Sequence, residues 1–285
     1  MKMNETDIKY FAGLLDADGC VSLRFITSKG VRRVSVGLSL SQRESHAAPV
    51  LQLCELFNVT PHYRDGKVEF SAARKTKLLA FADRVCKYMV VKGSLLRFAV
   101  DSAYQRESST VSPEEEQSLR KEFTERRRIG GPVKSIKHVS SSWAAGFLDG
   151  DGNYSMRLRK TKNGRSDDLC VRVGLTKTEK VLALQKLADR FGGVLHKERD
   201  KRGYFNWRLS LGKGNKKLAV SFLKDMRKRS KVKREKIEKL LHYHTRAAQT
   251  ELEGPHCGKL QSSTQKGVVS KTKKVHNLCP ASCPC

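Results

Sequence analysis

The chain has 285 residues, enough for two packed domains of ordinary size, and 38% of them are hydrophobic. Lysine and arginine number 57 against 29 aspartates and glutamates, a formal net charge of +28, which predicts a polyanionic partner such as nucleic acid. The sequence has no apolar run long enough to cross a membrane and no secretory signal, so we expect neither a membrane protein nor a secreted one.

A nine-residue segment near the amino terminus, Phe11–Gly19 (FAGLLDADG), recurs as Ala144–Gly152 (AAGFLDGDG). One recurrence at domain-sized spacing indicates an internal duplication. The apolar residues of each copy are typical of a helix, and its central Ala-Gly pair is small enough to let two helix backbones approach closely. The final glycines, Gly19 and Gly152, are expected in the left-handed conformation just past a helix end.

Each copy also places two aspartates in its last turn, Asp16 and Asp18 in one and Asp149 and Asp151 in the other. Negative charge at a helix C-terminus is unfavourable by roughly 0.3–1 kcal/mol per charge. Two such helices side by side would bring Asp18 and Asp151 together, and a divalent cation would resolve the conflict. A single copy would indicate only an Asp-Gly turn, whereas two matched copies favour a site for Mg²⁺ or Ca²⁺.

Segments of alternating polarity follow each motif. Over 20–28 and 33–40, one face is apolar and the other carries arginines and small polar residues, and the pattern returns over 154–159 and 168–175. This alternation is typical of antiparallel hairpins with one buried and one solvated face. A two-stranded ribbon of this kind fits the major groove of DNA, where arginine reads guanine.

Each second strand leads into a capping-box pattern, Ser41–Glu44 in the first copy and Thr176–Glu179 in the second. These patterns predict helices over about 43–57 and 178–191. A second hairpin follows, turning at Asp65-Gly66 and near Arg202-Gly203. Two more helices close each copy, over about 75–87 and 93–104 and then 214–227 and 231–245. The predicted order is α-β-β-α-β-β-α-α, twice.

The predicted organisation is a first half over 1–104, a linker over 105–138, a second half over 139–246 and a basic tail over 247–285. The linker contains a possible short helix at 113–127. The tail holds four cysteines and two histidines at loose spacing that matches no common zinc finger, which favours a disordered tail over a zinc site. These residues are His256, Cys257, His276, Cys279, Cys283 and Cys285.

The two nine-residue segments resemble the motif of the LAGLIDADG homing endonucleases in their two-motif, single-chain form, over about residues 5–245. The resemblance implies an α+β fold of two pseudo-symmetric repeats, whose antiparallel sheets form saddles over DNA and which pack through the two motif helices. It implies a monomer that recognises a long asymmetric site in double-stranded DNA and cuts both strands to leave 3′ overhangs. The implied cofactor is Mg²⁺, with Mn²⁺ or Ca²⁺ as substitutes for binding, and such enzymes are often encoded by the intron that they spread.

The resemblance also implies roles for residues that match the family pattern. Asp16 and Asp149 match an acid that is more often structural there. In the second half the implied phosphate-stabilising lysine is Lys233, and Arg229 or Lys231 could serve in its place. The implied metal ligands are Asp18, Asp151 and the carbonyls of Ala17 and Gly150. The residues implied to order the attacking water are Gln42 and Lys177, and the lysines implied to stabilise phosphate charge are Lys92 and Lys233.

The outward faces of the strands are expected to contact DNA. The candidate residues are Ser22, Arg24, Ile26, Ser28, Arg33, Ser35, Ser39, Arg64 and Lys67 in the first copy, and Ser155, Arg157, Arg159, Arg172, Lys197, Arg199, Tyr204, Asn206 and Arg208 in the second.

Three other functions stay open. An intron RNA maturase, with RNA as a partner, and a non-catalytic DNA-binding regulator would use the same fold, and a basic structural RNA binder would share the charge. The presence of both motif acids favours the nuclease. We expect the protein to act in the compartment of its synthesis, with a chloroplast or mitochondrion favoured over the nucleus or a bacterial cytoplasm.

Overall fold

The computed structural model describes residues 3–73, 75–106, 109–161, 164–175, 181–197, 205–210 and 216–252, without the side chains of 75, 156–161, 164–175, 210, 216 and 244–252. The chain divides into a compact unit, Met1–Arg246, and a second one, Ala247–Cys285. The cysteine-rich tail beyond Leu252 lies outside the described residues. No described helix is long and apolar enough to cross a membrane.

The first half contains two antiparallel hairpins joined into one four-stranded sheet of order β1-β2-β4-β3. Its elements are α1 (Glu5–Asp18), β1 (Cys20–Ser28), β2 (Val31–Arg43), the 3-10 turn η1 (Glu44–His46), α2 (Ala48–Phe57), β3 (His62–Arg64), β4 (Lys67–Ala72), α3 (Lys75–Val85), the 3-10 turn η2 (Cys86–Tyr88) and α4 (Gly93–Gln105).

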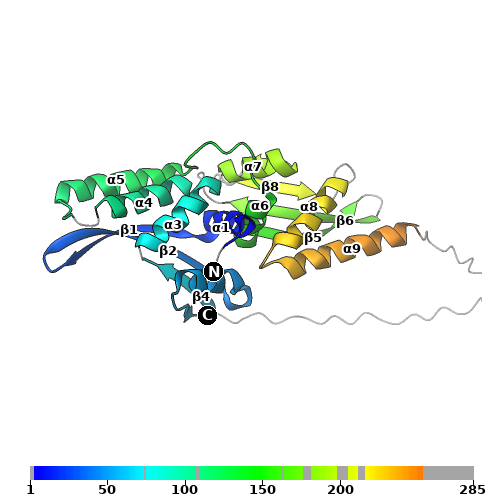
Figure 1. Cartoon of the computed structure of the whole chain (residues 1–285). Helices are drawn as coiled ribbons and strands as arrows, with labels where there is room; N and C mark the ends of the chain where they lie inside the picture. The colour runs from blue at the N-terminus through cyan, green and yellow to red at the C-terminus, as the bar shows by residue number, and fades with distance from the viewer. Residues whose placement is uncertain are drawn as a thin grey trace, which may run out of the picture. The chain divides into compact units, whose positions relative to one another are not determined.

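The second half (Figure 1) repeats this arrangement. Its strands pair in the order β5-β6-β8-β7. Its elements are α6 (Ser141–Asp151), β5 (Gly152–Thr161), β6 (Gly164–Leu175), α7 (Val181–Phe191), β7 (Val194–Lys197), β8 (Phe205–Ser210), α8 (Lys216–Arg229) and α9 (Arg234–Leu252). The predicted fold class, two α+β repeats with antiparallel sheets, is confirmed.

The inner face of each sheet forms a core with the helices that cover it. On β2 the alternating residues Val34, Val36, Leu38 and Leu40 are at most 1% exposed. Trp207 on β8 is fully buried, and its indole N–H donates to the carbonyl of Gly192 at 2.8 Å. The strict alternation puts every second residue of these strands into the core and leaves the opposite face for other contacts.

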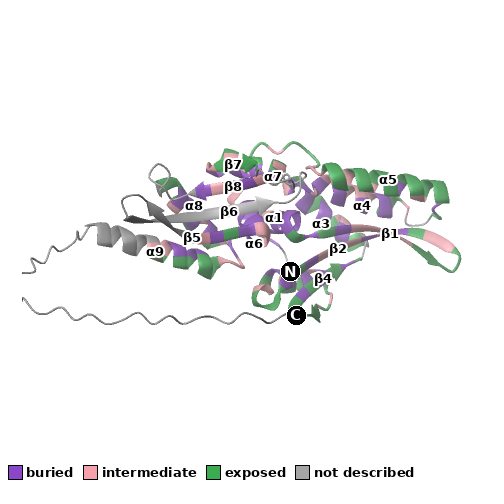
Figure 2. Cartoon of the chain, turned by 180° about the vertical axis from the view of Figure 1, so that it is seen from behind, coloured by how far each residue is buried: buried purple, intermediate pink, exposed green. Residues whose placement is uncertain are grey.

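The motif helices α1 and α6 pack against each other at the centre of the unit and are buried along most of their lengths (Figure 2). Their contact centres on two glycines at equal positions in the repeat. A Cβ on Gly13 would lie 1.9 Å from the carbonyl oxygen of Trp143, and one on Gly146 would lie 1.9 Å from that of Tyr10. Only glycine permits this approach of two helix backbones.

The glycines that end the motif helices do not adopt the expected left-handed conformation. Gly19 (φ −63°, ψ 142°) and Gly152 (φ −76°, ψ 148°) are extended. Space rather than backbone conformation requires glycine here: a Cβ would lie 2.6 Å from the Leu15 carbonyl oxygen at Gly19, and 2.5 Å from that of Leu148 at Gly152.

The capping box predicted at Ser41–Glu44 is also wrong. Ser41 belongs to β2 and pairs with Glu69 of β4, and α2 begins only at Ala48, with no side-chain cap. Pairing with β4 therefore continues β2 beyond the point where the local pattern favoured a helix. The corresponding pattern at Thr176–Glu179 lies outside the described residues.

The segment between the halves contains a helix, α5 (Pro113–Ile129), that is longer than the short helix predicted there. Ser112 caps it in a reciprocal capping box with Glu115. Val111 and Leu119 are buried, so this segment contributes to the core of the first half. After α5 the segment contacts the start of α4, where the Ser94 N–H donates to the Gly131 carbonyl at 3.0 Å.

Candidate active site

The earlier aspartate of each motif is buried and binds backbone donors. Asp16 accepts from the N–H groups of Val90, Val91 and Lys92 at 2.6–3.1 Å. Asp149 accepts from the same three positions of the second half, residues 231–233, at 2.8–3.3 Å. Each carboxylate thus fixes the segment that leads into the last helix of its own half. Burial raises the pKa of Asp16, and the hydrogen bonds from the backbone amides oppose this rise.

Each buried aspartate is also bound by an aromatic residue of the other motif helix. The Tyr10 hydroxyl donates to Asp149 at 2.7 Å, and the Trp143 indole N–H donates to Asp16 at 3.0 Å. Tyr10 and Trp143 occupy equal positions in the repeat. Sequence analysis missed this pair, although the equal positions of two large polar-tipped aromatics could have drawn attention to it.

We expect Asp16→Ala to lower the free energy of unfolding by about 2–4 kcal/mol, because it leaves buried N–H donors without an acceptor. Urea denaturation measures the change. Asp18→Ala, two residues away on the same helix but exposed, should change the free energy of unfolding by less than about 1 kcal/mol. Equal losses in the two variants would contradict the structural role of Asp16.

Two lysines bind the C-terminal ends of the motif helices. The Lys92 ammonium donates to the carbonyls of Leu15, Ala17 and Gly19 at 2.7–3.1 Å. The Lys233 ammonium donates to those of Leu148, Gly150 and Gly152 at 2.6–3.1 Å. Each cation offsets the helix dipole beside the motif acids. The chain itself therefore supplies part of the positive charge that the sequence argument assigned to a metal alone.

Of the three candidates in the 227–236 run, Lys233 is the one whose ammonium binds the end of α6, beside the motif acids. Burial lowers the pKa of its ammonium, and the negative charges of Asp149, Asp18 and Asp151 oppose this change. The two alternatives point elsewhere: Arg229 pairs with Asp225 at 2.9 Å, and Lys231 pairs with Asp7 at 2.7 Å. Lys231 thereby links the second half to α1 of the first.

The later aspartates, Asp18 and Asp151, end the paired helices. Asp18 is exposed, Asp151 is half-buried, and Gly150 lies directly against Asp18. A Cβ on Gly150 would lie 2.9 Å from the Asp18 Oδ2 atom, so a larger side chain would fill the space in front of this carboxylate. The closely packed helices therefore bring the two motif ends together, as the repeat predicted.

Gln42 lies at the end of β2, on the inner face. The residue is 9% exposed, and its side-chain amide donates to the Asp18 Oδ2 atom at 2.5 Å. Gln42 thus orients the Asp18 carboxylate. Strand pairing gives Arg172 the position of Ser39, and Leu175 the position of Gln42. The predicted correspondence of Lys177 with Gln42 is therefore wrong by two residues, and Lys177 itself lies outside the described residues.

The donors at the paired helix ends are hard oxygens, which suit Mg²⁺ or Ca²⁺. Within the described residues, no group of three or more His, Cys, Asp or Glu side chains forms a complete metal cage. Mg²⁺ is commonly held by one or two carboxylates together with water and substrate phosphates, and two carboxylates at adjacent helix ends fit this pattern. The carbonyls of Ala17 and Gly150 accept from the ammonium groups of Lys92 and Lys233, and a carbonyl oxygen can accept more than one bond.

The outer face of the first sheet is formed by the expected residues. Register pairs Arg24 with Ser35 and Ile26 with Arg33 across β1 and β2. Arg64 pairs with Lys67 across β3 and β4. The residues on this face that are exposed are Arg24, Ile26, Ser28, Arg33, Arg64 and Lys67, and those that are half-buried are Ser22, Ser35 and Ser39.

In the second sheet, Ser155 and Arg208 are half-buried and Lys197 is exposed. Asn206 is 6% exposed, so the exposure expected for it is wrong. It sits on central strand β8, between Gly174 and His196, where neighbouring strands cover it. The side chains of Arg157, Arg159 and Arg172 on β5 and β6 are not described, and Arg199 and Tyr204 lie outside the described residues.

No protein-family model and no curated protein matched the chain. Solved structures match it at 14% identity. I-LtrWI, a LAGLIDADG homing endonuclease bound to target DNA, has a TM-score of 0.64 over 87% of this chain and 94% of its own. The meganuclease I-SmaMI, bound to uncleavable DNA, has a TM-score of 0.66 over 88% and 95%. I-GzeII, a LAGLIDADG homing endonuclease in complex with its DNA target, has a TM-score of 0.64 over 90% and 94%.

The chain therefore has the fold of the LAGLIDADG homing endonucleases, in its two-repeat form. Its structural neighbours I-LtrWI and I-GzeII carry that family name, which agrees with the resemblance of the motifs.

Proposed function

We propose that this chain is a site-specific endonuclease that cuts double-stranded DNA with a divalent metal. The observation that carries the proposal is the pair of motif acids, Asp18 and Asp151, at the ends of two closely packed helices whose last carbonyls bind lysine ammonium groups. The structural neighbours support it, because they are complexes with target DNA, and one structure of I-SmaMI contains calcium ions and uncleaved DNA.

The metal would be held by Asp18, Asp151 and the carbonyls of Ala17 and Gly150, and when bound it would activate water and neutralise charge at the scissile phosphate. Gln42 holds the Asp18 carboxylate in place through its amide. Lys92 and Lys233 keep fixed positive charge at both helix ends, where phosphate charge grows during cleavage. Because these groups are preorganised, they need no rearrangement when the DNA arrives.

The substrate is proposed to be a long, asymmetric duplex site. Both halves belong to one chain, and their outward faces differ in sequence: Ile26 of the first corresponds to Arg159 of the second. A single chain with two different faces reads a non-palindromic site in one orientation. The proposal includes 3′ overhangs, action as a monomer and an origin within an intron, which rest on the resemblance of the motifs.

A library of plasmids with long randomised inserts tests this function. In Mg²⁺ we expect one family of non-palindromic sites to be cut on both strands, and none after chelation with EDTA. Binding in Ca²⁺ should weaken with salt at a log–log slope of about −0.9 per phosphate contacted. Selection of an intron RNA without any DNA cutting would instead favour a maturase, and binding without cutting would favour a regulator.

A further inference from the structure

The hairpin of β1 and β2 extends beyond the rest of its sheet. Strand β4 pairs with β2 only over Leu38–Arg43, whereas β1 pairs with β2 out to Ser28 and Val31. Among the strands that the structure describes, the part of β2 over Val31–Gly37 therefore has β1 alone as a neighbour. A two-stranded ribbon is marginally stable in water by itself, so this part of the hairpin requires support from elsewhere.

The support comes from the segment that joins the halves. Helix α5 lies along the extended hairpin (Figure 1). The Val111 N–H, just before α5, donates to the Arg32 carbonyl at 2.9 Å. The Arg120 guanidinium lies 4.6 Å from the centre of the Phe25 ring, a cation–π contact between α5 and β1.

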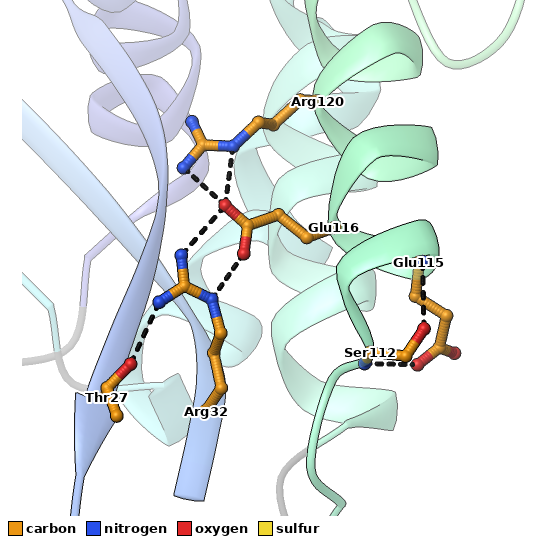
Figure 3. A network of polar contacts seen from close by, with 6 residues as sticks. All are labelled: Thr27, Arg32, Ser112, Glu115, Glu116 and Arg120. Atoms are coloured by element: carbon orange, nitrogen blue, oxygen red, sulfur yellow. Dashed lines mark hydrogen bonds and ion pairs between the residues drawn. The ribbon is translucent and has the colours of Figure 1, made fainter. Parts of the chain in front are cut away.

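Glu116 is the centre of this contact (Figure 3). Arg32 binds both of its carboxylate oxygens, one through Nε and the other through Nη2 at 2.9 Å, and Arg120 binds it at 2.7 Å. Arg32 also donates to the Thr27 hydroxyl at 2.9 Å, across the hairpin. The Glu116 side chain is only 14% exposed, and the hydrogen bond from Arg32 lowers its pKa to about 2. A two-point bond between charged planar groups fixes orientation as well as distance.

The opposite face of the same hairpin carries the candidate DNA contacts. Arg32 and Arg33 are consecutive residues of β2, so their side chains point to opposite faces. Arg32 binds α5, while Arg33 is exposed beside Ile26, its partner in register. Fixing Arg32 to α5 therefore fixes the direction in which Arg33, Ile26 and Arg24 are presented.

We propose that Glu116 is a positioning residue for target recognition, which touches no DNA but sets base preference at the outer end of one half-site. Through Arg32 it holds the extended hairpin to α5 before DNA binds. This inference rests on the proposed function. Its physical reason is that a preordered reading surface avoids the entropy cost of ordering on binding and penalises shifted registers on the wrong bases.

The test compares Glu116→Gln with Glu125→Gln. The control changes the charge of the same helix equally, but Glu125 binds Arg128 within α5. Binding selection on randomised duplexes should show that Glu116→Gln reduces base discrimination about fivefold at the outermost base pairs of one half-site, as expected for loss of a coupled contact. Discrimination at the central base pairs and the maximal cleavage rate should stay unchanged, and Glu125→Gln should resemble the wild type.

Arg32→Gln should reproduce the effect, and the double variant of Arg32 and Glu116 should be no worse than either single variant, because both remove one contact. The inference is overturned if the single effects add, or if Glu116→Gln weakens preference equally at all positions.

Amide hydrogen exchange of the DNA-free protein separates this inference from the proposed function. Residues 24–36 should exchange faster in Glu116→Gln than in the wild type or Glu125→Gln. If the wild type selects no DNA while this exchange difference is present, the proposed function fails and the hairpin support is still shown. If the wild type selects DNA and no exchange difference appears, the positioning role of Glu116 is refuted.

Discussion

Asp18→Asn and Asp151→Asn are each expected to lower the rate of double-strand cleavage about a thousandfold or more, because each removes a charged oxygen ligand of the proposed metal site. Folding should be unaffected, because Asp18 is exposed and Asp151 half-buried. Affinity for the target in Ca²⁺ should fall little, because the proposed phosphate contacts lie on the sheet faces and not at Asp18 or Asp151. Single-turnover cleavage of a selected site, with both strands labelled, measures the loss.

Asp189→Asn provides the matched control. Asp189 is exposed on α7 and accepts a hydrogen bond from Gln185 of the same helix, so the substitution makes the same change of charge outside the candidate site. It should cleave at the wild-type rate. Wild-type cleavage by either motif variant would show that the metal ligands have been assigned to the wrong residues.

Gly13→Ala and Gly146→Ala are expected to cause the largest losses of stability, about 3 kcal/mol or more in the free energy of unfolding. In each case the new methyl group meets a backbone carbonyl of the other motif helix at 1.9 Å. Backbone atoms cannot turn aside as a flexible side chain can, so the helices must separate. The same movement would displace the motif acids, and cleavage should fall with stability.

Gly66→Ala is the control for a glycine replaced without a steric clash. Gly66 has a φ of 67° at the β3–β4 turn, and a Cβ there would meet nothing within 4 Å. Gly66→Ala should lower the free energy of unfolding by about 1 kcal/mol, because alanine is strained in a left-handed backbone conformation. Urea unfolding of the three variants decides the comparison. Equal stabilities would contradict the close approach of α1 and α6.

The order of the elements could be predicted from the sequence because the signals for it are local. The alternation of Val34, Val36, Leu38 and Leu40 predicts a strand with one buried face, and the structure buries all four. Where a local signal competed with a long-range pairing, the pairing won: Ser41 resembles a helix cap but bonds as a strand residue to β4. Gly19 also departs from the local expectation, because it ends its helix in an extended conformation that leads directly into β1.

The candidate site was predictable as far as the repeat extends. The duplication identified Asp18 with Asp151 and Lys92 with Lys233, and the structure places both pairs at the ends of the motif helices. What joins the halves is not encoded in any local pattern. The bond from Tyr10 to Asp149 joins residues 139 positions apart, and the bond from Arg32 to Glu116 links a strand to the helix between the halves. Such contacts follow from packing geometry, which a single sequence does not give.

The most direct test of the central claim is anomalous diffraction from Mn²⁺ in crystals of the chain bound to a selected DNA site. The account predicts anomalous peaks about 2.0–2.6 Å from carboxylate oxygens of Asp18 and Asp151, each also contacting a phosphate of the DNA. Ordered DNA on the sheet faces with no Mn²⁺ peak in contact with either carboxylate, or with Mn²⁺ bound only elsewhere, would contradict it.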